Sequence, residues 1–388
     1  MPVVLFLVLA ISAHASIYYF LWIRLVRDTK VKAPWRRRLG WLLAAAALSV
    51  PVTMSANKLS NVFGQTLGWP VFFWMAIAGL LATSLFAIDS ARVVGWAARS
   101  ALRRETSEAD LSRRAFMRRV SGGGAALSAL GLSCQGAYQA LKVPSYAEMP
   151  ITLARLPKSM DGFVIAQITD LHVGNTIGEA FVSGVVEAVN AMKADLVVIT
   201  GDLVDGTVHS LREHVAPLAK LASRHGVFFV TGNHEYYAGA DSWIAHLQEL
   251  GIRVLRNERV SIGSEQASFD LAGIDDHGAS RWPGHGPDLA QATAGRDPER
   301  ELVLLAHQPR QVHIAKEHGV GLQLSGHTHG GQIWPWHYLV KAQQGGLLAG
   351  HSWHKQTQLY VSRGTGYWGP PVRVFAKSEI SRVVLRSA

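Results

Sequence analysis

The sequence predicts an α/β fold, a layered β-sandwich flanked by helices and preceded by a helical transmembrane region. Two observations predict it. The chain of 388 residues changes composition: residues 1–141 carry 16 Lys and Arg against 5 Asp and Glu, a net charge of +11, whereas residues 142–388 carry −1. In the second part short apolar runs alternate with helical stretches, roughly 30 residues from strand to strand, which is typical of parallel crossover units.

Residues 1–141 contain four apolar runs that predict membrane-spanning helices. Each approaches the roughly 20 residues that a helix needs to cross a bilayer. The alternative is that some of them are buried core helices, but Leu5–Ala10 and Trp41–Val50 lack the polar stripe of a soluble helix. The four predicted helices are Pro2–Ile23, Leu39–Ala56, Trp69–Ile88 and Val120–Leu141.

The distribution of basic residues predicts the orientation of these helices. The connection after the first run holds seven Lys and Arg, the one after the second holds one, and the one after the third holds eight. Because basic loops stay in the cytoplasm, we expect the N-terminus outside and the domain after residue 142 on the extracytoplasmic side. The sequence therefore predicts a multi-pass protein whose partner is the lipid bilayer of the inner (plasma) membrane.

A second signal for export precedes the fourth run. Residues 112–118, Ser-Arg-Arg-Ala-Phe-Met-Arg, resemble the bacterial twin-arginine motif S-R-R-x-F-L-K, with Met for Leu and Arg for Lys. No small-x-small cleavage site stands out after the helix, so we expect an uncleaved anchor. The alternative is an ordinary basic segment before a helix.

Residues 150–388 are predicted to form one α/β domain, in which short apolar or β-branched runs are buried strands. The first strands are expected at Phe163–Thr169, Leu196–Thr200, Val227–Thr231 and Leu302–Ala306, with helices at Glu179–Met192, Leu211–Ser223 and Asp241–Leu250. Later runs lack long helices between them and predict a second sheet that completes the sandwich. These runs are Phe269–Gly273, Gln323–Ser325, Gln358–Ser362 and Ile380–Leu385.

Polar side chains suited to metal binding follow the predicted strands. In open α/β sheets ligands bind in the crevice at the carboxyl ends of the strands, which is where these side chains are expected. Sixteen of the 17 His lie after residue 141, and the single Cys excludes a thiolate cluster. The motifs are Asp-x-His (Asp170, His172), Gly-Asp (Asp202), Gly-Asn-His-Glu (Asn233 to Glu235), His (His307) and Gly-His-x-His (His327, His329).

The donor atoms of these motifs are His nitrogens and carboxylate or amide oxygens. Such a set suits borderline-hard divalent ions such as Mn²⁺, Fe²⁺ or Zn²⁺. Taken singly, each residue has another explanation: Asp170 and Asp202 could cap the helices after their strands, and His307 could be a core histidine. Their joint order and spacing favour a metal site.

The five ordered motifs resemble the calcineurin-like metallophosphoesterase superfamily, whose pattern is D-x-H, G-D, G-N-H-[DE], H, G-H-x-H. The resemblance covers about residues 160–385 and implies a metallophosphoesterase-type sandwich. Residues 326–332, Gly-His-Thr-His-Gly-Gly-Gln, together with the apolar N-terminal part, are similar to the branch of transmembrane proteins with a metallophosphoesterase domain. Glu235 stands where many members have Asp, at a position that is not a ligand in the pattern.

The resemblance implies a hydrolase that cleaves a phosphoester with two divalent metal ions. It assigns Asp170, His172 and His329 to the first ion, Asn233, His307 and His327 to the second, and the Asp202 carboxylate to both. Two such ions acidify a shared water and clamp the phosphoryl oxygens. His234 resembles the histidine that steadies the transition state or protonates the leaving group. Asp205 is expected to orient His234 or another ligand.

Aromatic residues after the last motif predict an apolar rim near the metals. Trp334, Trp336 and the loop residue His277 are the candidate substrate contacts. A rim of this kind on a tethered domain suits a lipid-linked phosphoester at the bilayer surface; the alternative is that these residues cover the second sheet. The resemblance implies relatives that include enzymes cleaving the pyrophosphate of UDP-2,3-diacylglucosamine, a nucleotide lipid that faces the cytoplasm, whereas the charge pattern places this domain outside. Either the substrate differs here or the fourth helix does not cross.

Two other functions stay open at this stage. A non-catalytic metal or phosphate sensor needs the ligands but not His234, so the presence of His234 favours an enzyme. A phosphodiesterase acting on nucleotides is the other alternative. Nucleic acid itself is not an expected partner, because a groove that tracks its phosphates needs clustered Lys and Arg, and residues 142–388 carry a net charge of −1.

Overall fold

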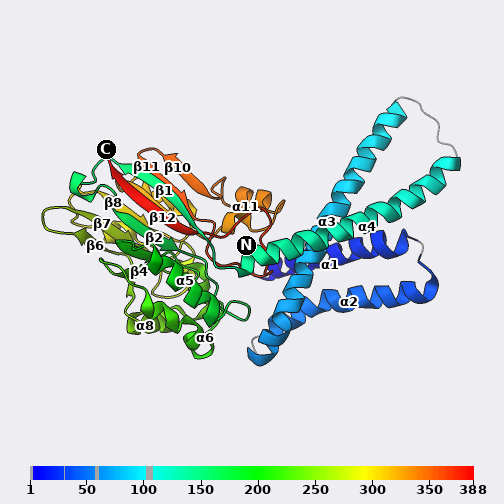
Figure 1. Cartoon of the computed structure of the whole chain (residues 1–388), viewed down its shortest axis with the longest axis horizontal. Coiled ribbons are helices and arrows are strands. Elements are labelled where there is room, and N and C mark those ends of the chain that lie inside the picture. Colours follow the sequence, from blue (N-terminus) through cyan, green and yellow to red (C-terminus); the bar gives the residue numbers. More distant parts are fainter. Residues whose placement is uncertain (1–2, 30, 57–60, 102–107) are drawn as a thin grey trace. The chain divides into compact units, whose positions relative to one another are not determined.

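The computed structural model describes residues 3–29, 31–56, 61–101 and 108–388 (Figure 1). It consists of two compact units. The first comprises Met1–Ala137 with Gly369–Val372, and the second comprises Tyr138–Trp368 with Arg373–Ala388. The first unit is helical and the second is an α/β sandwich, as the fold class predicted from the sequence requires.

The N-terminal helices cover all four predicted apolar runs within the described residues; Pro2 lies outside them. Two of the helices extend well beyond their apolar runs. Among the described residues, one helical segment, Leu67–Ala98, is both long and apolar enough to cross a membrane. The helices are α1 (Val3–Trp22, continued by a π-helical turn, Ile23–Arg27), α2 (Ala33–Ala56), α3 (Asn61–Ala101) and α4 (Glu108–Leu141).

Ion pairs join the helices of the first unit near the predicted cytoplasmic loops. Arg24, just after α1, donates to Asp28 and to Asp89 of α3, both at 2.7 Å. Arg92 of α3 lies 3.2 Å from the same Asp89. The twin-arginine-like segment 112–118 falls within α4, but the side chains of residues 112–115 and 118 lie outside the described part of the chain.

The second unit contains two six-stranded sheets. In the first sheet β2 to β5 run parallel, and β12 pairs antiparallel with β2. Its order is β1 (Tyr146–Leu153), β12 (Ile380–Ser387), β2 (Val164–Ile168), β3 (Leu196–Ile199), β4 (Val227–Phe229), β5 (Arg253–Val254). The order of the second is β10 (Gly350–His354), β11 (Thr357–Val361), β9 (Leu322–Ser325), β8 (Leu302–Leu305), β7 (Ser268–Gly273), β6 (Glu258–Gly263).

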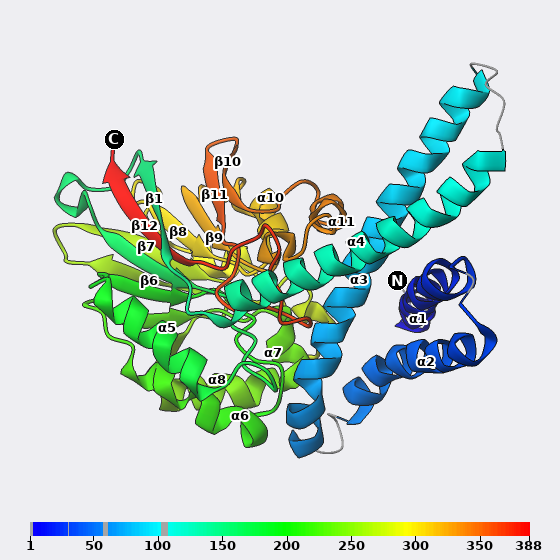
Figure 2. The ribbon, with the colours of Figure 1, turned by 45° about the vertical axis from the view of Figure 1, so that its right-hand side comes forward.

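Side chains alternate along the strands of the first sheet and bury both of its faces. Ile165 and Val198 join the core between the two sheets, where Leu305 and Leu324 meet them from the second sheet. Their neighbours in sequence pack instead against the helices that cover the outer face (Figure 2). Those helices are α5 (Glu179–Ala191), α6 (Val208–Val215) and α8 (Ala240–Glu249).

The structure corrects the predicted sheet membership of two strands. Leu302–Ala306 was expected beside the first strands, but β8 lies between β7 and β9 of the second sheet. Ile380–Leu385 was expected in the second sheet, but β12 pairs with β1 and β2 of the first. Both strands are largely buried on both faces. Their composition therefore does not indicate which neighbouring strands they pair with, or in which sheet.

Candidate metal centre

The five motifs follow strands β2, β3 and β4 of the first sheet and β8 and β9 of the second. The strand ends converge and bring two groups of potential ligands together, with the donor atoms of each group within 4.8 Å of one another. These two groups are Asp170, His172 and His329, and Asp202, His307 and His327. A third cluster with the same spacing, His172, Asp205 and His234, shares His172 with the first group. The two groups contain the ligands expected for each ion, apart from Asn233.

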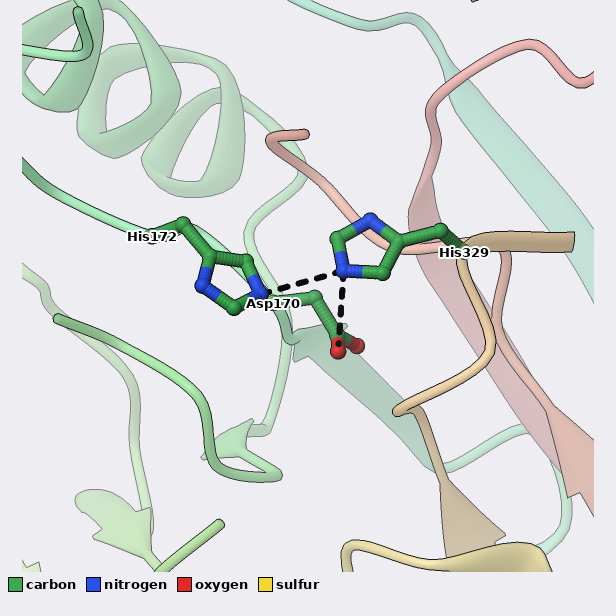
Figure 3. Close-up of side chains that lie close together, drawn as sticks. All are labelled: Asp170, His172 and His329. Carbon is green, nitrogen blue, oxygen red and sulfur yellow. Dashed lines mark hydrogen bonds and ion pairs between the residues drawn. The ribbon is translucent and has the colours of Figure 1, made fainter. Parts of the chain in front are cut away.

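In the first group the rings of His172 and His329 point their Nε2 atoms toward each other, and the Asp170 carboxylate lies beside them (Figure 3). The Nε2 atoms of His172 and His329 are 3.0 Å apart, and Nε2 of His329 lies 3.5 Å from Oδ1 of Asp170. All three residues are buried. Oδ2 of Asp202 is 3.8 Å from Nε2 of His172, so the expected bridging carboxylate borders this group.

The same carboxylate belongs to the second group. Oδ2 of Asp202 is 3.1 Å from Nε2 of His307, and that nitrogen is 3.2 Å from Nδ1 of His327. Asn233 begins α7 (Asn233–Ala238), directly after the turn that follows β4. Its side-chain oxygen Oδ1 is buried and finds no hydrogen-bond partner among the described residues. A buried amide oxygen without a partner is costly, and a cation removes that cost.

The backbone at the ends of the strands is bent into an unusual conformation. Five of the motif residues have positive φ angles between 49° and 73°, a region that residues other than glycine seldom enter and that is enriched at active sites. They are Asp170, His172, Asp202, His327 and His329. The motif glycines permit close approach: a Cβ at Gly326 would collide with the Asp170 carboxylate, and one at Gly232 with that of Asp202.

Asp205 binds two of the histidines at once. Its Oδ1 accepts a hydrogen bond from Nδ1 of His172 at 2.9 Å and from Nδ1 of His234 at 2.6 Å. Burial alone would raise the pKa of Asp205, but the two imidazoles outweigh burial and lower it. With a proton held on each Nδ1, Nε2 of His172 points into the first group, and Nε2 of His234 lies 3.9 Å from Oδ2 of Asp202.

Three of the ligands have pKa shifts that favour metal binding, and two have shifts that oppose it. Burial would raise the pKa of Asp202, but the neighbouring His307 and His234 hold it well below the usual range. Burial, with a contribution from His172, lowers the pKa of His329 well below that of a free histidine. Burial and the charge of His307 lower the pKa of His327 to about 3. An ionised carboxylate and neutral imidazoles are the forms that bind cations.

The two opposing pKa shifts belong to Asp170 and His307. Burial raises the pKa of Asp170. Burial would lower the pKa of His307, but the charge of Asp202 raises it well above that of a free histidine, so His307 must lose a proton when a cation binds.

Glu235 has a role that the motif comparison did not identify. Its buried carboxylate accepts hydrogen bonds from the backbone N–H groups of Asp202 at 3.0 Å, Leu203 at 2.7 Å and Gly232 at 2.6 Å. It therefore ties the loop after β3 to the loop after β4, and holds Asp202 beside α7. The longer side chain of Glu spans the two loops at a position where many family members have Asp.

Sequence reasoning missed Arg373. This fully buried side chain donates to the carbonyl oxygens of His329 at 3.1 Å and Gly366 at 2.6 Å, and its guanidinium lies 3.1 Å from Nδ1 of His329. Arg373 lies 44 residues beyond His329 in no recognisable motif. The only signal in the sequence is an arginine within an otherwise apolar segment.

The three predicted substrate contacts do not belong to either ligand group. Trp334 and Trp336 are exposed, and so is His277. Trp334 lies in the wall of a cavity of about 340 Å³, whose lining also includes Lys341 and Arg363. Gly330, the residue after His329, lines the same cavity. The cavity therefore borders the segment that carries the last motif.

Comparisons with known proteins show the family of the chain. A family model, calcineurin-like phosphoesterase, matches residues 163–331. An uncharacterized metallophosphoesterase of Helicobacter pylori is 41% identical over 271 residues, which are 70% of this chain and 71% of that protein. Transmembrane proteins with a metallophosphoesterase domain from Danio rerio and Bos taurus are 37% and 39% identical, over 66% of this chain and 61% and 60% of theirs. The chain therefore belongs to the calcineurin-like metallophosphoesterases, and it is a phosphoester hydrolase.

Proposed function

We propose that the chain is a membrane-anchored phosphoesterase that uses two divalent metal ions to hydrolyse a phosphodiester or a pyrophosphate. The observation that carries this proposal is the convergence of six potential ligands from four separate strand ends. Asn233, whose buried Oδ1 has no hydrogen-bond partner among the described residues, follows a fifth strand end. The first ion is assigned Asp170, His172 and His329, the second is assigned Asn233, His307 and His327, and Asp202 is shared. The nitrogen and oxygen donors favour Mn²⁺, Fe²⁺ or Zn²⁺.

When bound, a pair of divalent ions lowers the pKa of a shared water and neutralises charge on the phosphoryl oxygens. The residues of the chain prepare the rest of the reaction. Asp205 fixes the rings of His172 and His234 through their Nδ1 atoms. His234 thereby directs Nε2 toward the centre, where it can donate a proton to the leaving oxygen. Glu235 keeps Asp202 in place between the two ligand groups.

The test of the proposal is a screen of phosphoester hydrolysis by the purified full-length protein. We expect turnover of bis(p-nitrophenyl) phosphate or p-nitrophenyl phosphate in Mn²⁺, abolished by a chelator and restored by added Mn²⁺. No turnover of either ester, with metal bound, would contradict the proposal and favour a metal-binding sensor. The ratio of the two activities would separate a diesterase from a monoesterase.

We infer a lipid-linked substrate from the side chains that follow the last motif. Five of the large apolar side chains that are exposed after the last motif lie at residues 334–339 and 375, and the cavity beside Trp334 combines apolar walls with Lys341 and Arg363. Exposed apolar surface next to cations suits a ligand with an acyl chain and an anionic head group. The five side chains are Trp334, Trp336, Tyr338, Leu339 and Phe375.

A comparison of matched substrates tests this inference. The enzyme is expected to hydrolyse a long-chain phosphoester in mixed micelles faster than its short-chain analogue, and Trp334→Ala with Lys341→Ala is expected to remove the difference. Trp353→Ala, at another exposed tryptophan, serves as the control. Equal rates on both chain lengths in the parent enzyme would exclude a lipid-specific site.

The membrane anchor is supported by the apolar segment Leu67–Ala98 and by relatives named as transmembrane proteins. We propose a multi-pass anchor in the plasma membrane with the catalytic domain outside the cytoplasm, because the basic residues alternate between connections. Reporter fusions at the C-terminus test the topology: alkaline phosphatase is expected to be active and a cytoplasmic fluorescent protein dark. The reverse result would place the domain in the cytoplasm. Loss of export on Arg113→Lys with Arg114→Lys would assign the segment 112–118 to twin-arginine export.

A further inference from the structure

Three aromatic side chains lie beside His234, and we call them the aromatic rim: Tyr237, Trp282 and Trp368. The rings of Tyr237 and Trp368 meet the His234 ring edge to face, with centroids 5.4 Å and 5.8 Å away. Trp282 packs against Tyr237 with ring centroids 5.7 Å apart. Tyr237 and Trp368 therefore contact the histidine assigned to the leaving group, and Trp282 supports Tyr237. None of the three belongs to a ligand group.

The rim is held in position by the same elements that carry the metal motifs. Tyr237 lies three residues after His234 on α7, so both side chains project from one face of that helix. The backbone of Trp368 is clamped by the side chain of Gln332, which donates to its carbonyl at 2.9 Å and accepts from its N–H at 3.0 Å. Gln332 closes the last motif, three residues after His329. The segment that supplies a ligand therefore also positions Trp368.

Two of the rim rings are largely exposed: Tyr237 by 61% and Trp368 by 54%. Each contacts His234 with only part of its surface, and the rest faces solvent. Rigid exposed aromatic rings beside a reacting group are suited to stacking on a planar ligand, and every nucleobase or aryl group offers such a face.

We propose that the aromatic rim is a leaving-group subsite, selective for phosphoesters whose leaving group contains a planar aromatic ring. This inference rests on the proposed function. In that reaction the water releases a proton to solvent and its oxygen bonds to phosphorus. The bond from phosphorus to the leaving oxygen breaks, and His234 gives its proton to that oxygen and is reprotonated from solvent. The leaving group is then on the His234 side, within reach of Tyr237 and Trp368. A nucleobase and a simple aryl group share the required chemistry.

The experiment compares three substrates in the full-length protein with Mn²⁺: an aryl diester, methyl p-nitrophenyl phosphate; a nucleotide pyrophosphate, uridine diphosphate; and an alkyl diester, methyl 2,2,2-trifluoroethyl phosphate. For each substrate the kcat/KM of Tyr237→Leu and Trp368→Leu is divided by that of the parent, so the intrinsic reactivity of the ester cancels. We expect the ratio to fall about tenfold further for aromatic leaving groups than for the alkyl one. Trp368→Phe keeps a ring and is expected to restore most of the loss.

The outcomes are distinguishable. A selective loss on one aromatic substrate alone supports the subsite and identifies its source, aryl or nucleobase. An equal loss on all three substrates means that the rings only pack against His234, and it overturns the subsite, as does no loss at all. A parent enzyme inactive on every ester with metal bound would contradict the proposed function itself. Trp353→Leu, 61% exposed in β10, is the matched control and should leave all three ratios near one.

Discussion

Replacement of Asp205 tests how the chain couples metal binding to proton transfer. Asp205 is not itself a ligand in the proposal, yet one of its oxygens receives hydrogen bonds from His172 at 2.9 Å and His234 at 2.6 Å. In Asp205→Ala both rings lose the acceptor that fixes their orientation and their tautomer. We therefore expect losses in two separate measurements, metal affinity through His172 and turnover through His234.

The size of each loss follows from the bonds removed. A hydrogen bond to a charged group contributes about 1.5–3 kcal/mol, which corresponds to roughly a 10- to 150-fold change in an equilibrium constant. Partners that orient metal-bound histidines typically change affinity or activity by about 10- to 100-fold. For Asp205→Ala we expect the Mn²⁺ concentration for half-maximal activity to rise by about tenfold or more, and kcat at saturating Mn²⁺ to fall by a similar factor.

The assay is a titration of phosphodiester hydrolysis with Mn²⁺, accompanied by metal analysis of the dialysed protein. Asp205→Asn retains an oxygen acceptor and is expected to lose less than Asp205→Ala. Asp241→Asn, whose side chain is 79% exposed, is the control and should behave like the parent. An Asp205→Ala enzyme with unchanged Mn²⁺ dependence and unchanged kcat would show that Asp205 positions neither His172 nor His234.

Three further changes have expected outcomes. His234→Ala should retain bound metal and lose about 10²–10⁴-fold in kcat, measured on diester and monoester, since it removes a proton donor; full activity on both esters would contradict its assigned role. Glu235→Ala leaves three buried N–H groups without their acceptor, at about 1–3 kcal/mol each; a lowered Tm is expected, and an unchanged Tm would rule out its role in tying the two loops. Gly326→Ala places a Cβ against the Asp170 carboxylate and should reduce metal content; a normally loaded, active variant would show that the close packing there is dispensable.

The sequence predicted the buried interior strands well because their apolar runs are distinct. It missed β1, β5, β6 and β10 for physical reasons that differ from strand to strand. All four are edge strands of the two sheets, and β5 is only two residues long. β1 and β6 expose alternate or polar side chains, so they resemble loops in composition. Tertiary pairing, which assigns β8 and β12 to their sheets, is not encoded in local pattern.

The site divides in the same way. The ligand positions could be predicted because glycine, aspartate and histidine recur after strand ends in a fixed order. The residues that support the ligands could not be predicted, because they bind backbone groups or segments that are distant in the sequence. Arg373 reaches His329 across 44 residues, and Gln332 reaches Trp368 across 36. Glu235 was visible in its motif, but its three backbone partners become apparent only when the loops after β3 and β4 are folded together.

The central claim is that two metal ions share the Asp202 carboxylate. The most direct measurement is the metal stoichiometry of the full-length protein, determined by elemental analysis beside the hydrolysis rate, for the parent and for Asp202→Asn. We expect two divalent ions per chain in the active parent, and joint loss of metal and activity in the variant. An active parent that holds a single ion, or an Asp202→Asn protein that stays loaded and active, would contradict it.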